Sequence, residues 1–236
     1  MKKYLALLAA LLISSSVYAD PVVKKALEAR FPDLKVEKLT KSGYGGLYEV
    51  FAGGEVFYTD EKASFVILGQ IVDAKTRENI TEARLRKLTA IAFNSLPLDQ
   101  AIKTVIGNGS RRMAVFSDPY CGYCKRFEPD ILALKDVTIY TFLLPIIRQE
   151  STPMSKRIWC SADRVKAWQD IMLRNTEPGS EAGCENPIDQ VLVLGQMLRI
   201  TGTPTTIFED GERVSGALPK DMIEKRLTAA ASAKKQ

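Results

Sequence analysis

The sequence predicts an α+β protein of two modules: a small antiparallel sheet with one helix, followed by an α/β module. The first part of the chain carries short β-rich segments separated by glycines such as Gly43, Gly45 and Gly53. The later part alternates strand-like and helix-like segments. A cysteine pair, Cys121 and Cys124, stands where one strand pattern gives way to a helix pattern.

The chain begins with the pattern of an export signal. Lys2 and Lys3 form a short positive region, an apolar run over residues 4–13 follows, and small residues lead up to Ala19. The run is shorter than the ~20 residues that a membrane-spanning helix needs. We therefore expect residues 1–19 to be a signal peptide cleaved after Ala19, and the mature chain to reach the periplasm, an oxidising compartment.

Composition narrows the classes of function. The sequence has no histidine, which excludes Ser-His-Asp triads, Cys-His pairs and every histidine metal site. The net charge of +5 is modest and no basic stripe stands out, so we expect no nucleic-acid partner. We also expect no metal and no cofactor, which leaves the chemistry to carboxylates, lysines, hydroxyls or cysteines.

Residues 20–79 are expected to form a small domain with one helix and about four strands. Asp20 is a candidate N-cap and Pro32 ends the helix. The apolar stripe of this helix comprises Val22, Val23, Ala26, Leu27 and Phe31. The strands are expected at residues 34–39, 47–52, 55–59 and 64–72. A domain of this size buries only a small hydrophobic core. Association with a second copy would bury more apolar surface, which favours a role as a dimerisation module.

Residues 80–97 are expected to form a linker helix that acts as a semi-rigid spacer. Asn79 and Glu82 resemble a capping box, and Pro97 stops the helix. The apolar face comprises Leu85, Leu88, Ile91, Ala92 and Leu96.

Residues 98–236 are expected to form the α/β domain. Its strands are predicted at residues 112–117, 137–144, 205–209 and 213–215. A helix should run from the cysteine pair through Leu134 with an interruption at Pro129, and a helical insertion should span residues 149–197. A last helix begins at Lys220, and the tail from residue 229 is expected to fray.

Cys121 and Cys124 have the spacing of a redox dithiol. Because they open a helix, Cys121 faces unpaired backbone N–H groups and the positive end of the helix dipole, which stabilise a thiolate. Cys124, one turn further on, could then attack a mixed disulfide formed at Cys121. An inert structural disulfide and half of a metal site remain alternatives, although the other cysteines lack the spacing of a zinc ribbon.

Cys160 and Cys184 lie in the polar helical insertion. In an oxidising compartment the simplest expectation is a structural disulfide between them. A second redox pair is the alternative, but no helix-start motif activates either thiol.

Some side chains near the cysteine pair have more than one interpretation. Phe116 and Tyr123 are expected to shape substrate access. Asp118 and Glu128 could relay protons, but surface carboxylates near a helix start are the simpler interpretation. Trp159 and Trp168 are expected in the core of the inserted helices rather than on a substrate-binding surface.

The chain resembles a known family. The resemblance to the thioredoxin fold rests on residues 118–125, DPYCGYCK, and on residues 202–205, GTPT. Together with the export signal, residues 44–50 and the linker helix, the whole chain resembles the DsbC/DsbG family of periplasmic disulfide isomerases. Gly122 favours the DsbC branch, because the DsbG branch usually carries CPYC.

The resemblance implies properties that the residues alone do not give. The Thr203–Pro204 peptide bond would be cis and would face the cysteine pair, so that Thr203 and Pro204 bind substrate beside Cys121. The protein would be a homodimer joined through its N-terminal domains. A membrane reductant of the DsbD type would keep the cysteine pair reduced.

The predicted function is a thiol-disulfide isomerase and reductase with chaperone-like binding of partly folded clients. Cys121 attacks an incorrect disulfide of an exported protein, and a client thiol or Cys124 resolves the mixed disulfide. The alternatives are a dithiol oxidase, a holdase chaperone and a metal-binding module.

Overall fold

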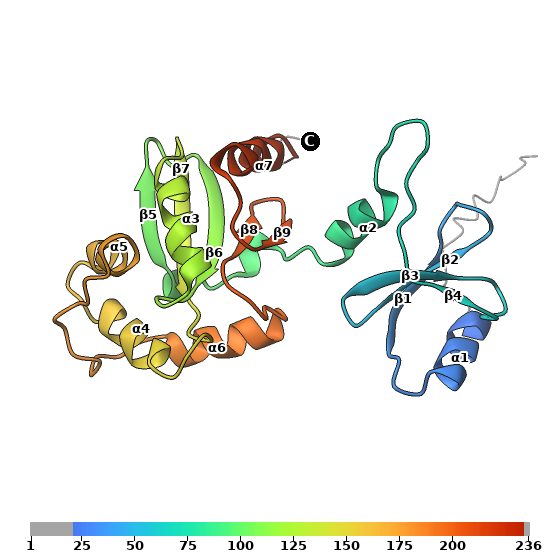
Figure 1. Ribbon diagram of the computed structural model, residues 1–236, viewed down its shortest axis with the longest axis horizontal. Coiled ribbons are helices and arrows are strands. Elements are labelled where there is room, and N and C mark those ends of the chain that lie inside the picture. Colours follow the sequence, from blue (N-terminus) through green and yellow to red (C-terminus); the bar gives the residue numbers. More distant parts are fainter. Residues whose placement is uncertain (1–20, 234–236) are drawn as a thin grey trace, which may run out of the picture. The chain divides into compact units, whose positions relative to one another are not determined.

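The computed structural model describes residues 21–233 (Figure 1). The chain forms two compact units, and the boundary falls between Leu88 and Thr89. The predicted signal peptide, its cleavage site after Ala19 and the predicted N-cap Asp20 lie outside the described residues. No helix within residues 21–233 is both long and apolar enough to cross a membrane.

The N-terminal unit is an antiparallel meander with a helix packed against it, as the sequence predicts. Its elements are α1 (Pro21–Arg30), β1 (Val36–Lys41), β2 (Tyr48–Ala52), β3 (Glu55–Thr59) and β4 (Val66–Ile67), and the sheet order is β1-β2-β3-β4. Gly53 and Gly54 join β2 to β3 with φ angles of 62° and 87°, a turn that glycine adopts without strain. The last strand is much shorter than the expected residues 64–72.

Only part of the predicted apolar stripe of α1 faces the sheet. Val23 and Leu27 are fully buried in the core of this unit, whereas Val22 is 70% and Phe31 is 44% exposed. Val23 and Leu27 share one helix face because they are four residues apart, and Val22 lies about 100° around the helix from Val23. Phe31 follows the end of the helix. The prediction that Val22 and Phe31 belong to the buried stripe was wrong.

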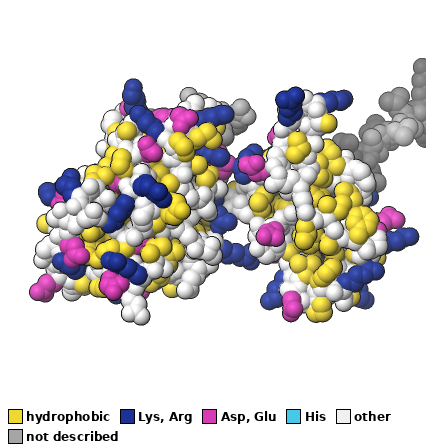
Figure 2. All heavy atoms as spheres, viewed as in Figure 1, with side chains coloured by type: hydrophobic (Ala, Val, Ile, Leu, Met, Phe, Trp, Pro, Cys, Tyr) yellow, Lys and Arg dark blue, Asp and Glu magenta, His cyan; other side chains and the backbone are white. Residues whose placement is uncertain are grey.

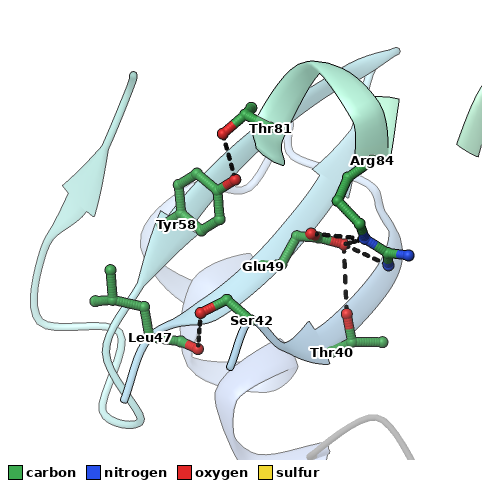
Figure 3. Close-up of polar contacts among 7 residues, drawn as sticks. All are labelled: Thr40, Ser42, Leu47, Glu49, Tyr58, Thr81 and Arg84. Carbon is green, nitrogen blue, oxygen red and sulfur yellow. Dashed lines mark hydrogen bonds and ion pairs between the residues drawn. The ribbon is translucent and has the colours of Figure 1, made fainter. Parts of the chain in front are cut away.

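Polar contacts fasten α2 (Ile80–Leu88) to the sheet (Figure 3). Glu49 on β2 is 4% exposed and accepts hydrogen bonds from Arg84 Nε at 2.9 Å and from Arg84 Nη2 at 2.7 Å. The hydroxyl groups of Tyr58 and Thr81 form a hydrogen bond of 2.5 Å. These contacts make α2 part of the N-terminal unit.

α2 ends at Leu88, so the predicted linker helix over residues 80–97 is too long. Beyond Thr89 the backbone N–H of Ile91 donates to the carbonyl of Gly211 at 3.0 Å, and Phe93–Ser95 forms a 3-10 turn. Phe93 and Leu96 are buried in the core of the C-terminal unit. Leu85 and Leu88 of the predicted helix face lie in α2. Of the rest, Ile91 and Leu96 pack in the core of the second unit in a segment that is not an α-helix, and Ala92 is exposed.

The C-terminal unit is a mixed sheet with helices, which agrees with the predicted α/β module. The strands are β5 (Ile102–Ile106), β6 (Arg111–Ser117), β7 (Val137–Leu143), β8 (Thr205–Phe208) and β9 (Arg213–Ser215), in the order β5-β7-β6-β8-β9. The helices are α3 (Gly122–Leu132), α4 (Ser151–Trp159), α5 (Arg164–Arg174), α6 (Ile188–Met197) and α7 (Lys220–Ala233). α3 connects β6 to β7, which pair in parallel, and all other pairs in this sheet are antiparallel.

Alternate residues of β6 supply the cores on the two faces of this sheet. Met113 and Val115 pack with residues of α3 and α7, whereas Ala114 and Phe116 pack with residues of α6. α4 and α5 form a third cluster that includes Cys121 and Cys124. The inserted helices thus provide part of the core on which the cysteine pair rests.

Other local predictions need correction. α3 runs through Pro129 without a break, because buried residues on both sides of the proline, Phe127 and Ile131, hold the helix against the sheet. β5 is absent from the strands predicted for this domain, yet it pairs with β7 along its whole length. The final helix continues to Ala233 where fraying was expected.

Candidate active site

The cysteine pair lies where β6 ends and α3 begins. Cys121 is the N-cap of α3, and its Sγ accepts a hydrogen bond from the backbone N–H of Cys124 at 3.3 Å. The N–H of Cys121 in turn donates to the carbonyl of Asp118 at 3.1 Å. The sulfur therefore takes the place of a capping oxygen, at the helix end that favours negative charge.

A distant segment of the chain also reaches Cys121. The Sγ of Cys121 donates to the carbonyl oxygen of Thr203 at 3.2 Å, and the Thr203–Pro204 peptide bond is cis. This segment leads directly into β8, which pairs with β6. The fold thus brings Thr203 and Pro204 to the cysteine pair.

Both cysteines of the pair are buried. Cys121 is 3% exposed, whereas Tyr123 beside it is 62% exposed, with the Arg126 guanidinium 4.5 Å from its ring centre. The prediction for Phe116 was wrong: it is fully buried and stacked on Phe142, with ring centres 4.7 Å apart. Tyr123 is therefore a large exposed side chain next to Cys121.

Cys124 lies deeper in the protein. It is 1% exposed, and burial together with a hydrogen bond to Cys121 raises the pKa of its thiol to about 12. The neighbouring polar groups of Ser117, Asp118 and Thr203 act in the opposite direction and lower this pKa. Cys124 is consequently a protonated thiol at neutral pH.

Asp118 is a buried anchor and not the surface carboxylate that we expected. It is completely buried, and its Oδ1 accepts hydrogen bonds from Tyr120 N at 2.8 Å and Ser151 Oγ at 2.9 Å. Its Oδ2 accepts from the backbone N–H groups of Ile146 and Ile147 at 2.8 and 2.9 Å. This carboxylate ties the turn that carries Cys121 to the start of α4.

Glu128 is also buried, which again contradicts the surface interpretation. It is 4% exposed and accepts a hydrogen bond from the indole N–H of Trp168 at 3.0 Å. Burial raises the pKa of its carboxyl to about 7, and the hydrogen bond from Trp168 partly offsets this rise. The spacing of four residues from buried Cys124 was the signal in the sequence that could have placed it on the inner face of α3.

Trp159 and Trp168 are buried in the core of the inserted helices, as predicted. Trp159 is 7% exposed and Trp168 is 1% exposed. Through its contact with Glu128, Trp168 joins α5 to the helix that begins at Cys121.

Cys160 and Cys184 are joined by a disulfide, with their Cα atoms 5.7 Å apart. Next to this bond, Arg157 holds the following loop through contacts with Glu177, Pro178 and Ser180. The hydroxyl of Tyr120 donates to Glu177 at 3.3 Å. The disulfide-bonded loop therefore touches the residue that precedes Cys121.

The sequence matches two protein families. Residues 98–231 match the family "Thioredoxin-like domain", and residues 14–82 match the family "Disulfide bond isomerase protein N-terminal domain". These regions correspond to the larger part of each structural unit.

Curated relatives and a solved structure agree with these matches. A Bordetella pertussis protein named "Probable thiol:disulfide interchange protein DsbC" is 45% identical over 205 residues, which are 87% of this chain and 73% of the relative. The thiol:disulfide interchange protein DsbC of Escherichia coli K12 is 25% identical over 198 residues, 81% of either chain. A disulfide interchange protein of Neisseria gonorrhoeae has a crystal structure with a TM-score of 0.55 and 38% identity, covering 57% of this chain and 98% of that one.

Proposed function

This chain belongs to the DsbC family of thiol:disulfide interchange proteins, and we propose that Cys121 is the attacking thiol and Cys124 the resolving thiol of its disulfide isomerase activity. The observation that carries these roles is the position of the two sulfurs. Cys121 caps the start of α3 with its sulfur, whereas Cys124 is buried one turn further on.

The exchange begins when the Cys121 thiolate attacks a client disulfide. A bond forms between Cys121 Sγ and one client sulfur, the client S–S bond breaks, and the second client sulfur leaves as a thiolate. The helix start stabilises the attacking sulfur, because its N–H groups and dipole favour negative charge there.

The mixed disulfide can then be resolved in two ways. If a client thiolate attacks it, the client is isomerised and Cys121 leaves as a thiolate, with no net change of redox state. If Cys124 attacks it, the client leaves reduced and the protein keeps a Cys121–Cys124 disulfide. After this second route the Cys121–Cys124 disulfide must be reduced by an external dithiol before the next cycle, and we propose a membrane protein of the DsbD type as that reductant.

Thr203, Pro204 and Tyr123 are proposed to bind the client beside the attacked sulfur. Support comes from the 3.2 Å contact between Cys121 and the Thr203 carbonyl, and from the exposed ring of Tyr123. A client segment extended along residues 202–205 would present its cysteine to Cys121. Cys160 and Cys184 are proposed to act structurally, by holding the loop that contacts Tyr120.

A homodimer joined through the N-terminal unit is the proposed assembly. Figure 2 shows hydrophobic side chains gathered over this unit. Its exposed large apolar residues in and around β4 are Phe65, Ile67, Leu68 and Val72. The match of residues 14–82 to the isomerase N-terminal domain supports this role, and the two active sites of a dimer would serve one partly folded client.

The proposed location is the periplasm, reached by cleavage of the signal peptide after Ala19. The export pattern of residues 1–19 and membership of the DsbC family support this location. Clients would then be exported proteins with incorrect disulfides.

Refolding of scrambled ribonuclease tests the proposed roles of the cysteines. We expect Cys121→Ser to abolish reactivation of the scrambled enzyme. Cys124→Ser is the matched control, since it should lose net reduction of the client and retain isomerisation by client thiols. Full reactivation by Cys121→Ser would refute the assignment.

A further inference from the structure

A tyrosine lies on each side of Cys121 in the chain, and each has a cation beside its ring. Tyr123 is 62% exposed, and the guanidinium carbon of Arg126 lies 4.5 Å from its ring centre. Arg126 follows Tyr123 by three residues, so both side chains lie on one side of α3, and Arg126 is itself exposed. A cation over an aromatic ring is held in place without a carboxylate. Its charge is therefore available to a molecule that approaches Cys121.

Tyr120 has two further cations beside its ring. The guanidinium carbon of Arg148 lies 3.4 Å from the ring centre, and the ammonium nitrogen of Lys125 lies 6.0 Å from it. The position of Arg148 is fixed by the backbone, because the N–H of the preceding residue, Ile147, donates to Asp118 in the turn that leads to the cysteine pair. Three positive charges thus lie at the rings of the two tyrosines.

Two carboxylates lie beside these rings, and each already has an arginine partner. Glu177 accepts a hydrogen bond from the hydroxyl of Tyr120 and pairs with Arg157 at 2.9 Å. Glu150 lies 3.6 Å from Arg148, and both side chains of that pair are at least half exposed. These carboxylates leave the cations of α3 without a countercharge.

The two cations of α3 have neutral partners. Lys125 donates to the side-chain oxygen of Asn175 at 2.5 Å, and Arg126 lies over the ring of Tyr123. Within residues 21–233 no carboxylate pairs with either cation. The surface beside Cys121 is consequently positive, and its charge acts on a partner over about 8–10 Å at ordinary ionic strength.

We propose that Lys125, Arg126 and Arg148 select client disulfides whose cysteine is flanked by carboxylates. This inference deepens the proposed function and rests on Cys121 as the attacking thiol. A client Asp or Glu one or two residues from the attacked cysteine lies about 3–7 Å further along an extended chain. It would pair with one of the three cations while the client sulfur meets the Sγ of Cys121.

Without these cations an acidic client would be a poor substrate. The attacking sulfur is an anion, so it repels a carboxylate next to the client disulfide. Cations around the sulfur reverse the sign of that interaction. Complementary charge acts mainly on the rate of association, and added salt screens it. The protein should therefore prefer the opposite client charge from a free thiolate, and the preference should fall as salt is added.

The test compares three peptide disulfides that differ only in the residues on either side of the cysteine, which are glutamate, glutamine or lysine. Reduced full-length protein is mixed with each peptide, quenched with acid and alkylated, and mass spectrometry gives the second-order rate constant for the mixed disulfide at Cys121. Dithiothreitol, whose thiolate has no neighbouring cation, is the chemical reference and should favour the lysine peptide. We expect the protein to favour the glutamate peptide over the lysine peptide about tenfold in about 20 mM salt and about twofold in about 0.5 M salt.

Substitution of single cations should change this preference. Arg126→Gln and Arg148→Gln should each lower the ratio of the two rate constants about threefold, and Arg126→Glu should lower it further. Because each ratio is measured on one protein, a change in the reactivity of Cys121 itself cancels. Lys135→Gln is the matched control, since it removes an exposed positive charge just beyond the other end of α3, and it should keep the wild-type ratio.

Two results would overturn the proposal. One is equal rate constants for the glutamate and lysine peptides in the wild type. The other is a ratio that Arg126→Gln, Arg148→Gln and Arg126→Glu leave unchanged. If no peptide formed a mixed disulfide at Cys121, the proposed roles of the cysteines would fail instead. The failures are distinguishable, because the first two retain the adduct at Cys121.

Discussion

The sulfur of Cys121 lies 3.2 Å from the carbonyl oxygen of Thr203, a residue 82 positions further along the chain. The sheet fixes this contact, because Thr205 pairs with Phe116 of β6 just before the cysteine pair. Asp118 fixes the opposite side of the turn through its hydrogen bonds to residues 146–151. Cys121 is thus fixed on both sides, by the segment that leads into β8 and by the segment that precedes α4, and its sulfur is presented in one geometry.

Removing the Asp118 carboxylate should destabilise the C-terminal unit. Asp118→Ala leaves the N–H groups of Ile146 and Ile147 and the Ser151 hydroxyl without their acceptor in a buried site. We expect the free energy of unfolding to fall by about 4 kcal/mol, as measured by urea unfolding of the full chain. Asp130→Asn serves as the control with a change of less than about 0.5 kcal/mol. A loss below about 1 kcal/mol for Asp118→Ala would show that other contacts hold this turn.

Removing the ion pair on α2 should destabilise the N-terminal unit. Arg84→Met leaves Glu49, which is 4% exposed, without its cation. Because the Arg84 side chain is 34% exposed, we expect a loss of about 2 kcal/mol, less than for a fully buried pair. Arg86→Met is the matched control: its partner Glu82 is 54% exposed, so the change should stay within about 0.5 kcal/mol. Equal effects of the two substitutions would refute the anchoring role of Glu49 and Arg84.

The disulfide of the helical insertion should contribute to stability. Its sequence separation of 24 predicts about 3.5 kcal/mol from chain entropy, so Cys160→Ala combined with Cys184→Ala should lower the free energy of unfolding by about that amount. Cys160→Ala alone is the control and should give a loss of the same size. An unchanged urea midpoint in the double variant would contradict a structural role.

Stability should depend on pH through Glu128. Its folded-state pKa of about 7 lies above the ordinary value of 4.5, so between these values the folded protein holds a proton that the unfolded chain releases. The stability contributed by the neutral carboxyl is therefore full below about pH 4.5 and declines as the pH rises to about 7. Relative to Glu128→Gln, the wild type should lose about 3 kcal/mol across this window. A difference between the two proteins that is independent of pH would contradict the buried assignment.

Local features account for what the sequence could predict. The glycine pair between β2 and β3, the strand that ends at Ser117 and the helix that starts after Cys121 each depend on neighbouring residues. Alternating burial and turn chemistry therefore suffice to locate them. The cysteine spacing at a strand-to-helix junction likewise located the candidate site without knowledge of the fold.

Contacts between distant segments account for what the sequence could not predict. Glu128 is buried because Trp168, 40 positions later, folds back against α3, and Asp118 is buried by residues about 30 positions later. The apolar residues between Leu88 and Pro97 have a helical spacing, but packing of Phe93 against the second sheet overrides it. Apart from the four-residue spacing between Cys124 and Glu128, no pattern within a short window distinguishes these outcomes from the ones that we expected.

The central claim is that Cys121 makes the first covalent bond to a client. The most direct test mixes Cys124→Ala protein with scrambled ribonuclease, traps the adducts with acid and alkylating reagent, and maps the linked cysteine by mass spectrometry. We expect adducts joined only through Cys121 in this variant, and no adduct when Cys121→Ala is added. The absence of any adduct, or an adduct joined through Cys160 or Cys184, would contradict the account.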